Sequence, residues 1–334
     1  MSPLGQCVLL GDIGATNARF ALVESGSLGT VQNFKVAKYR QFTDVLERVL
    51  AKAVGGRGPR VQRAFFAVAG PVNGSRLKLT NTSWVIDTRE LQNEFALQVE
   101  MVNDFAALAY SLPWLSTKDL SQIGNGDPDI AAPIAVVGPG SGLGVACLVP
   151  GADKPVVLAS EGGHATLAGA CEREDQILAH LRNRFGHVSA ERAISGPGLE
   201  NIFQAISVID GHGEPAAAAA EITINALEDK SQRAREALSL FCAFLGSFAG
   251  NVALTFGAHG GVYIGGGISP RILNFLSQSD FRKRFESKGR FRDYLKDIPT
   301  YVITHPAATL VGLKSFLAPQ GEKPSPRRAR EASC

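Results

Sequence analysis

Short apolar runs separated by glycine-containing segments dominate the first third of the chain. Residues 7–10 and 18–23 are largely apolar and flank a turn-like segment at 11–17, which predicts a hairpin with a polar tip. The apolar runs 64–69 and 97–102 end at turn or polar residues and predict two further strands. The opening of the chain therefore predicts a sheet.

The same plan of strand, glycine turn and strand recurs later in the chain. Residues 134–137 and 145–149 are apolar and flank the glycine-rich segment 138–144. Such a repeat predicts two related lobes.

Apolar residues at helical spacing predict helices in both parts of the chain. The first part has one such pattern at 43–54, which we expect to pack on the sheet. In the second part the helical patterns are 174–185, 198–209, 221–228 and 232–256, followed by a strand at 261–264. The larger, second lobe is therefore expected to be rich in helices.

One uncharged stretch has the length of a membrane span. Residues 238–270 carry no Asp, Glu, Lys or Arg. Glycines and polar residues interrupt it, and Gly260-Gly261 divides it. We expect a buried helix followed by a buried strand, and no membrane partner.

The composition favours a large globular protein. The 334 residues are 45% hydrophobic and 19% charged, which excludes a disordered or fibrous chain. Lys and Arg total 34 against 31 Asp and Glu, without the cationic excess that a nucleic-acid binder usually shows. Small neutral or anionic substrates are expected, and no nucleic acid.

The cysteines and the N-terminus indicate a reducing compartment. The five cysteines lie far apart, without the Cys or Cys/His spacing of a metal site. They are Cys7, Cys147, Cys171, Cys242 and Cys334. The N-terminal segment lacks the pattern of a signal peptide, so we expect free thiols in a cytoplasmic protein.

The first glycine turn predicts a phosphate site. It comprises Gly11, Asp12, Ile13, Gly14, Ala15 and Thr16. Glycines let backbone N–H groups approach a charged ligand. A carboxylate at the end of a buried strand is costly unless a positive charge meets it, and Mg²⁺ carried by a nucleotide would do so. The alternative is an ordinary hairpin in which Asp12 accepts from turn amides.

Two further glycine clusters follow buried strands. Gly138–Gly144 does not match the dinucleotide fingerprint, and the chain lacks the GK[ST] of a Walker loop. Gly265–Gly267 follows the strand at 262–264, where bare backbone would admit a purine ring. Taken alone, this third cluster is also typical of a strand-to-helix turn.

The order of these clusters resembles that of the two-lobed kinases related to hexokinase and actin. Seven segments are similar to bacterial glucokinases: GDIGATNARFAL from Gly11, NTSW from Asn81, VNDFAA from Val102, GPGSGLGVA from Gly138, EGGH from Glu161, HVSAERAISGPGL from His187 and GGVYIGGGI from Gly260. The resemblance extends over roughly residues 1–315. It departs at Ala15, where many relatives have Gly, and in the polar tail after Leu317.

This resemblance implies a role for each matching residue. Gly11 to Thr16 and Gly140, Ser141 and Gly142 would hold ATP phosphates, and Gly265 and Gly266 would border adenosine. From the buried carboxylate itself, Asp12 is expected to meet Mg²⁺ directly or through water. Asp104 would be the catalytic base. Asn103, Glu161, His164, Glu191 and Asn81 would bind sugar hydroxyls.

The resemblance also implies an architecture. We expect an α/β, two-lobed, actin-like ATPase/hexokinase fold, with mixed sheets flanked by helices and a cleft between the lobes. The small domain would comprise residues 1–114 and 304–317, and the large domain residues 115–303. Residues 318–334 are too polar to order themselves and are expected to be disordered. The family further implies a homodimer.

Several of these residues also have purely structural interpretations. Asp104 precedes a helical segment and would make a good N-cap, although Asn103 offers one too. Glu191 could be a solvent-facing charge, His164 a core histidine, and Trp84 a part of the core of the small lobe. From spacing alone the structural interpretations of Glu191 and His164 are favoured, whereas the EGGH and SAER matches favour function. For Asp104, the cap offered by Asn103 and the resemblance favour catalysis. For Trp84 neither interpretation is favoured.

The expected activity is transfer of the terminal phosphoryl group of ATP to the 6-hydroxyl of glucose. Holding the sugar oxygen in line and neutralising charge would supply the catalysis, with Asp104 accepting the hydroxyl proton. One alternative is a kinase of the same fold that acts on another hexose or an amino sugar. Another is a non-catalytic sugar-sensing regulator, which would not need Asp104.

Overall fold

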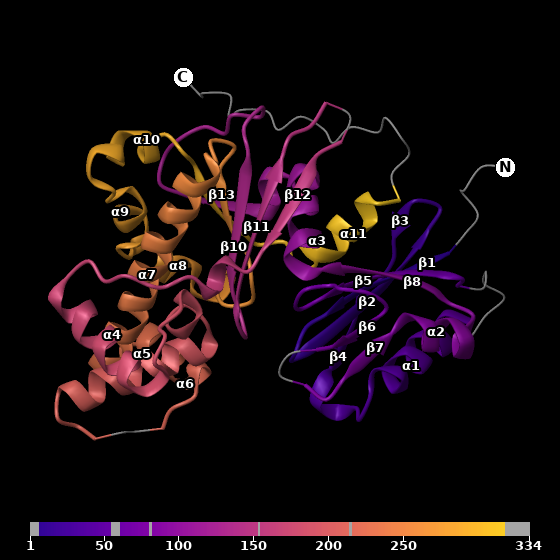
Figure 1. The fold of residues 1–334 in the computed structure, drawn as a ribbon, viewed down its shortest axis with the longest axis horizontal. Coiled ribbons are helices and arrows are strands. Elements are labelled where there is room, and N and C mark those ends of the chain that lie inside the picture. The colour runs from indigo at the N-terminus through magenta and orange to yellow at the C-terminus, as the bar shows by residue number, and fades with distance from the viewer. Residues whose placement is uncertain (1–6, 55–60, 80–81, 153, 214–215, 318–334) are drawn as a thin grey trace. The chain divides into compact units, whose positions relative to one another are not determined.

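The computed structural model describes residues 7–54, 61–79, 82–152, 154–213 and 216–317. Asn81, Cys334 and the tail 318–334 lie outside these residues. The chain divides into two compact units (Figure 1). Unit 1 comprises Met1–Ser116 and His305–Cys334, and unit 2 comprises Thr117–Thr304.

The sheet of unit 1 begins with the predicted hairpin. Its strand order is β3-β2-β1-β5-β8, with β4 also beside β2. The strands are β1 (Val8–Ile13), β2 (Asn17–Glu24), β3 (Ser27–Leu28), β4 (Gln32–Lys35), β5 (Arg63–Val68) and β8 (Gln98–Asn103). β1 pairs antiparallel with β2 and parallel with β5, and β5 pairs parallel with β8. A separate ribbon pairs β6 (Arg76–Lys78) with β7 (Val85–Asp87).

Both faces of this sheet are buried, which explains why β1 is a continuous apolar run. Leu9 belongs to a core shared with α1 (Phe42–Val54), whereas Leu10 belongs to a core shared with α11 (Ala308–Ser315). Helix α2 (Thr88–Phe95) precedes β8, and α3 (Asp104–Ser111) follows it directly. α11, yellow in Figure 1, comes from the far end of the sequence and packs against α3.

The sheet of unit 2 repeats this plan. Its order is β12-β11-β10-β13-β14-β9. The strands are β9 (Leu120–Ile123), β10 (Ile134–Pro139), β11 (Leu143–Val149), β12 (Val156–Ser160), β13 (Val262–Ile264) and β14 (Thr300–Ile303). β10 forms a hairpin with β11 and pairs parallel with β13, as β1 does with β2 and β5. The predicted repeat is thus present in the strand order.

Helices make up much of unit 2, as predicted. They are α4 (Glu172–Phe185), α5 (Gly196–Ile209), α6 (Ala219–Leu227), α7 (Gln232–Phe256), α8 (Leu273–Gln278), α9 (Phe281–Glu286) and α10 (Arg292–Lys296). α7 is long and apolar enough to cross a membrane, but 78% of its most apolar window is buried inside the protein. It ends at Gly257 in the left-handed conformation, and β13 follows, so the prediction of a buried helix and a buried strand is confirmed.

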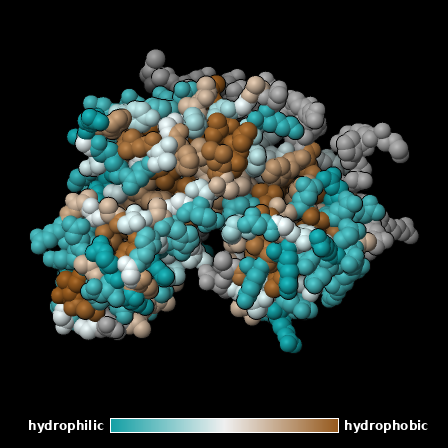
Figure 2. Space-filling model, in the orientation of Figure 1, coloured by the Kyte–Doolittle hydropathy of each residue, from teal (hydrophilic) through white to brown (hydrophobic). Residues whose placement is uncertain are grey.

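Two features concern the surface and the thiols. β12 is an edge strand of its sheet, and Val156 and Leu158 on it are 56% and 47% exposed. Figure 2 shows apolar residues gathered over this strand.

Among the described cysteines, Cys7, Cys147, Cys171 and Cys242 are free, as expected.

Candidate active site

Unit 1 brings its predicted site residues to the carboxyl ends of its parallel strands. Ile13, Val68 and Asn103 are aligned across β1, β5 and β8. In open α/β sheets, ligands bind beyond the carboxyl ends of the strands. The glycine turn after β1 and Asp104 after β8 therefore leave the sheet at the same edge.

The first glycine turn is a tight hairpin. The Gly14 N–H donates to the Asn17 carbonyl at 3.0 Å. Gly11 and Ile13 are buried in β1, and a side chain at Gly11 would come within 2.7 Å of the Phe66 ring. Core packing thus explains the glycine at position 11. The backbone that a phosphate could reach is that of Gly14–Thr16, which is half-buried to exposed.

Arg19 meets the carboxylate of Asp12. The two residues face each other across the β1–β2 hairpin, and Arg19 Nη1 donates to Asp12 Oδ2 at 3.1 Å. Burial raises the pKa of Asp12, and the positive charge of Arg19 opposes that rise. Neither sequence interpretation of Asp12 included Arg19, so its burial no longer argues for Mg²⁺ by itself. The register of the β1–β2 hairpin, which places Asp12 opposite Arg19, was the signal that could have predicted this pair.

Asn103 takes the N-cap of α3 and leaves Asp104 as the first helical residue. Asn103 Oδ1 accepts from the Ala106 N–H at 3.0 Å, and its Nδ2 donates to the Gly70 carbonyl at 3.2 Å. Asp104 is half-buried, and its Oδ1 accepts from the Phe105 N–H at 2.9 Å. The N-cap interpretation of Asp104 is therefore wrong. Asn103 keeps one further N–H and one further acceptor site for a ligand.

Of Asn81 and Trp84 in the NTSW segment, the structure describes only Trp84. Asn81 lies outside the described residues. Trp84 is fully buried, its Nε1 donates to the Tyr39 carbonyl at 3.2 Å, and its ring packs edge-on against Phe42. Trp84 is a core residue of unit 1.

In unit 2 the second glycine turn joins β10 and β11. The Gly140 N–H donates to the Gly142 carbonyl at 2.8 Å, and Ser141 at the tip is exposed. Gly265 follows β13 and donates its N–H to the Val137 carbonyl at 2.8 Å. Both turns thus lie at the carboxyl ends of parallel strands, as the corresponding turns of unit 1 do.

The third glycine cluster, Gly265–Gly267, packs on the end of β10, the strand that precedes the second glycine turn. Gly266 has a φ of +77°, and a β-carbon there would lie 2.9 Å from the Pro139 carbonyl carbon. Glycine is needed at this position for both reasons. Gly266 and Gly267 are exposed, so their backbone is open to a ligand.

The EGGH segment forms a short turn beside β11. The His164 N–H donates to the Glu161 carbonyl at 2.9 Å, and Gly163 packs so closely on Leu143 that a β-carbon would lie 3.0 Å from the Leu143 carbonyl carbon. Glu161 and His164 are both exposed. The interpretation of His164 as a core histidine is therefore wrong.

Glu191 lies in the neighbouring segment and contacts the second glycine turn. An isolated bridge between Thr166 and Ser189 ties its segment to the EGGH segment. Glu191 is half-buried, and its Oε2 accepts from the Leu143 N–H at 2.9 Å. Glu191 is thus not a solvent-facing charge.

In unit 2, Glu161, His164 and Glu191 therefore lie around a glycine turn suited to phosphate. Their carboxylate and imidazole groups can bind the hydroxyls of a polyol. Unit 1, taken by itself, has a glycine turn and a helix-start carboxylate. A sequence model of the glucokinase family matches residues 9–320. The chain belongs to the glucokinase family.

Curated glucokinases are similar over nearly the whole chain. The glucokinase of Chromobacterium violaceum is 46% identical over 312 residues, covering 93% of this chain and 89% of that protein. The glucokinase of Yersinia pestis strain Pestoides F is 43% identical and covers 92% and 95%.

Solved glucokinases share the fold. The glucokinase of an Antarctic psychrotroph has a TM-score of 0.80 at 36% identity, covering 93% of this chain and 98% of that one. The Balamuthia mandrillaris glucokinase in complex with glucose has a TM-score of 0.77 at 20% identity, with 94% and 93% covered. The expected actin-like α/β fold of the glucokinase family is thus confirmed.

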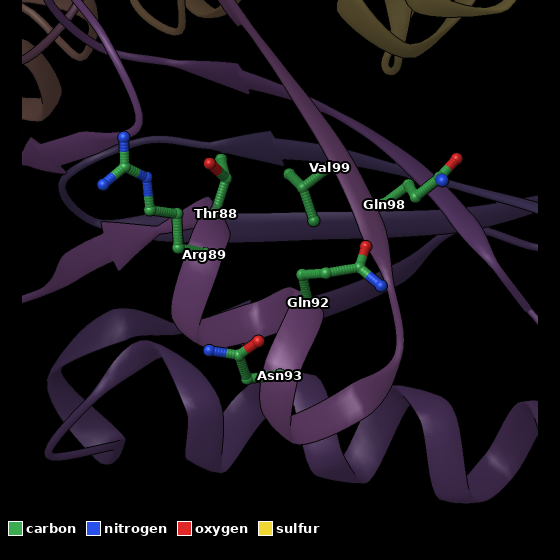
Figure 3. A pocket seen from close by; sticks show the side chains of 6 residues that line it. All are labelled: Thr88, Arg89, Gln92, Asn93, Gln98 and Val99. Carbon is green, nitrogen blue, oxygen red and sulfur yellow. The ribbon is translucent and has the colours of Figure 1, made fainter.

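A polar surface hollow in unit 1 lies away from the candidate site residues of that unit. Its volume is about 470 Å³, and it is lined by Thr88, Arg89, Gln92 and Asn93 of α2 and by Gln98 and Val99 of β8 (Figure 3). These β8 residues begin the strand, whereas Asn103 ends it. Because ligands bind at the carboxyl ends of parallel strands, the hollow is at the wrong end of β8 for the substrates.

Proposed function

We propose that this chain phosphorylates the 6-hydroxyl of glucose with ATP as the donor. Membership of the glucokinase family supports the reaction, and the similar structures named as complexes with glucose, or with glucose and AMPPNP, support the two substrates. The observation that carries the proposal is the placement of Asp104 directly after β8, with Asn103 acting as the cap.

Asp104 is proposed as the base. The positive end of the helix macrodipole favours a carboxylate at the first position of α3, so Asp104 is held ready to accept a proton. A base beside the reacting hydroxyl contributes about 10² to 10⁴ in rate. Asn103, Glu161, His164 and Glu191, with Asn81, are proposed to orient the sugar through its hydroxyls.

The glycine turns are proposed to hold the nucleotide. Backbone N–H groups of Gly14–Thr16 and Gly140–Gly142 would bind phosphates, and Gly265-Gly266 would border adenosine. Among the described residues no cluster of three or more His, Cys, Asp or Glu could hold a metal ion. A single carboxylate, Asp12, fits Mg²⁺ that arrives with the phosphates, because Mg²⁺ is usually bound by one or two carboxylates plus substrate phosphates. When bound, Mg²⁺ would neutralise charge on the phosphates.

The test replaces Asp104 by its uncharged isostere. We expect Asp104→Asn to lower kcat by about 10²- to 10⁴-fold while glucose binding, measured by calorimetry, stays within about twofold. The matched control is Asp44→Asn, which changes another first-turn carboxylate, in α1, and should leave kcat unchanged. Near-normal turnover of Asp104→Asn would remove the assignment.

We also propose that the protein is a cytoplasmic homodimer. The uncharged edge strand β12, with Val156 and Leu158 exposed, is a surface that a second copy could cover. We expect the mass of a dimer by light scattering, and that of a monomer for Leu158→Lys. A monomeric mass of the unchanged protein at micromolar concentration would refute the dimer.

A further inference from the structure

Glu191 makes a contact that binding a sugar does not require. Its Oε2 accepts from the backbone N–H of Leu143, which directly follows the glycine turn Gly140–Gly142. A hydrogen bond to a charged group is stronger than one between neutral groups. The carboxylate also occupies the space beside the turn, since a β-carbon at Gly142 would lie 2.5 Å from Oε2.

A second bond holds the other side of the same turn. The Gly196 N–H donates to the Gly140 carbonyl at 2.8 Å. Ser195 Oγ donates to the Glu191 carbonyl at 2.8 Å and accepts from the Gly198 N–H at 3.0 Å, so the segment that carries both contacts is fixed to the start of α5. The turn is thus held on both sides by residues 191–196.

Two of the three residues of the turn, Gly140 and Gly142, are glycines. Within the turn itself the Gly140 N–H bonds to the Gly142 carbonyl, and its glycines have more conformational freedom to lose than other residues. Ordering such a turn before the ligand arrives improves affinity, because that entropy cost is no longer part of binding. We propose that Glu191 is a positioning residue that orders the Gly140–Gly142 turn for the phosphates of ATP.

This role rests on the proposed function. It would let one carboxylate, that of Glu191, contact both the sugar and the turn that binds ATP. A carboxylate has two oxygens with two acceptor sites each, so Oε2 can serve Leu143 while acceptor capacity remains for a sugar hydroxyl. The negative charge itself repels phosphate. The ordering effect and the charge effect therefore have opposite signs, and Gln, which keeps an acceptor oxygen without the charge, separates them.

The test measures AMPPNP binding by calorimetry with magnesium and without sugar. We expect Glu191→Ala to weaken binding about tenfold, because one bond that orders the turn is lost. Glu191→Gln should bind at least as tightly as the unchanged protein. The matched control is Glu221→Ala, which removes an exposed carboxylate of unit 2 outside the candidate site and should leave AMPPNP affinity unchanged.

A second measurement uses the contact with Gly142. Gly142→Ala should weaken AMPPNP binding in the unchanged protein, because its methyl group displaces the carboxylate, and should add little in the Glu191→Ala background. Melting curves of each variant exclude a loss of folding as the cause.

Two results would overturn the proposal: normal AMPPNP affinity of Glu191→Ala, or a loss in Glu191→Gln as large as in Glu191→Ala. Failure of the proposed function is a separate result. It would be seen as no glucose binding by the unchanged protein, whatever the AMPPNP affinities of the variants.

Discussion

Gly312 lies where α11 crosses α3, the helix that begins with Asp104. A β-carbon added at Gly312 would lie 2.8 Å from the carbonyl carbon of Ala107 and 3.0 Å from the backbone nitrogen of Ser111. Both neighbours are backbone atoms, so no side chain can rotate away. Since non-bonded carbons pack at about 3.5 Å or more, the two helices must separate locally by about 0.7 Å or more.

The size of the effect follows from two opposing terms. Alanine is favoured over glycine in a helix by about 1 kcal/mol. Overpacking a well-filled interface costs about 3 kcal/mol at the upper end of its usual range. We therefore expect Gly312→Ala to lose about 2 kcal/mol, which lowers the Tm by about 6 °C in a unit of this size.

The same substitution should lower activity more than its loss of stability alone would. A misplacement of about 1 Å at a catalytic group can reduce the rate by about 10²-fold. Thermal melting and steady-state kinetics well below the Tm measure the two effects separately. Thr309→Ala, on the same helix, is the control and should change neither. A Gly312→Ala protein as stable and active as the original would refute the argument that this close crossing positions Asp104.

Two further predictions concern charged groups. Asp12→Asn keeps a hydrogen-bond partner for Arg19 but removes the carboxylate that would meet Mg²⁺. We expect the ratio of the ADP affinities with and without Mg²⁺ to fall by about tenfold. An unchanged ratio in calorimetry would exclude the metal role. Arg284 donates two bonds of 2.8 and 2.9 Å to Glu174, which is 1% exposed. Arg284→Met should cost about 4 kcal/mol in urea unfolding, and adding Glu174→Met should recover most of it; a cost below about 1 kcal/mol would contradict a buried pair.

Much of the architecture could be predicted from local patterns. The apolar runs around the glycine turns at 11–17 and 138–144 give the two hairpins, and the periodicity at 232–256 gives α7 with the same bounds. Such elements are determined by residues close together in sequence. The placement of α11 on the first sheet could not be read from its own pattern, because it depends on contacts with strands some 300 residues away.

The candidate site shows the same limit. The sequence left open whether Asp104 or Asn103 caps the helix. The hydrogen bond from the Ala106 N–H to Asn103 decides for Asn103. Arg19 was missed because side-chain pairs across a hairpin follow from register rather than from spacing along the chain. The bond between Glu191 and Leu143 joins residues 48 positions apart, and only the folded chain brings them together.

The discontinuity of unit 1 has a consequence for synthesis on the ribosome. All of unit 2 is made before α11 emerges, so the sheet face that contains Val8 and Leu10 lacks the cover that α11 provides until unit 2 has been translated. During that interval the nascent chain exposes an apolar surface that chaperones recognise. Unit 1 therefore closes only after unit 2 has been translated, although its sheet is made before unit 2.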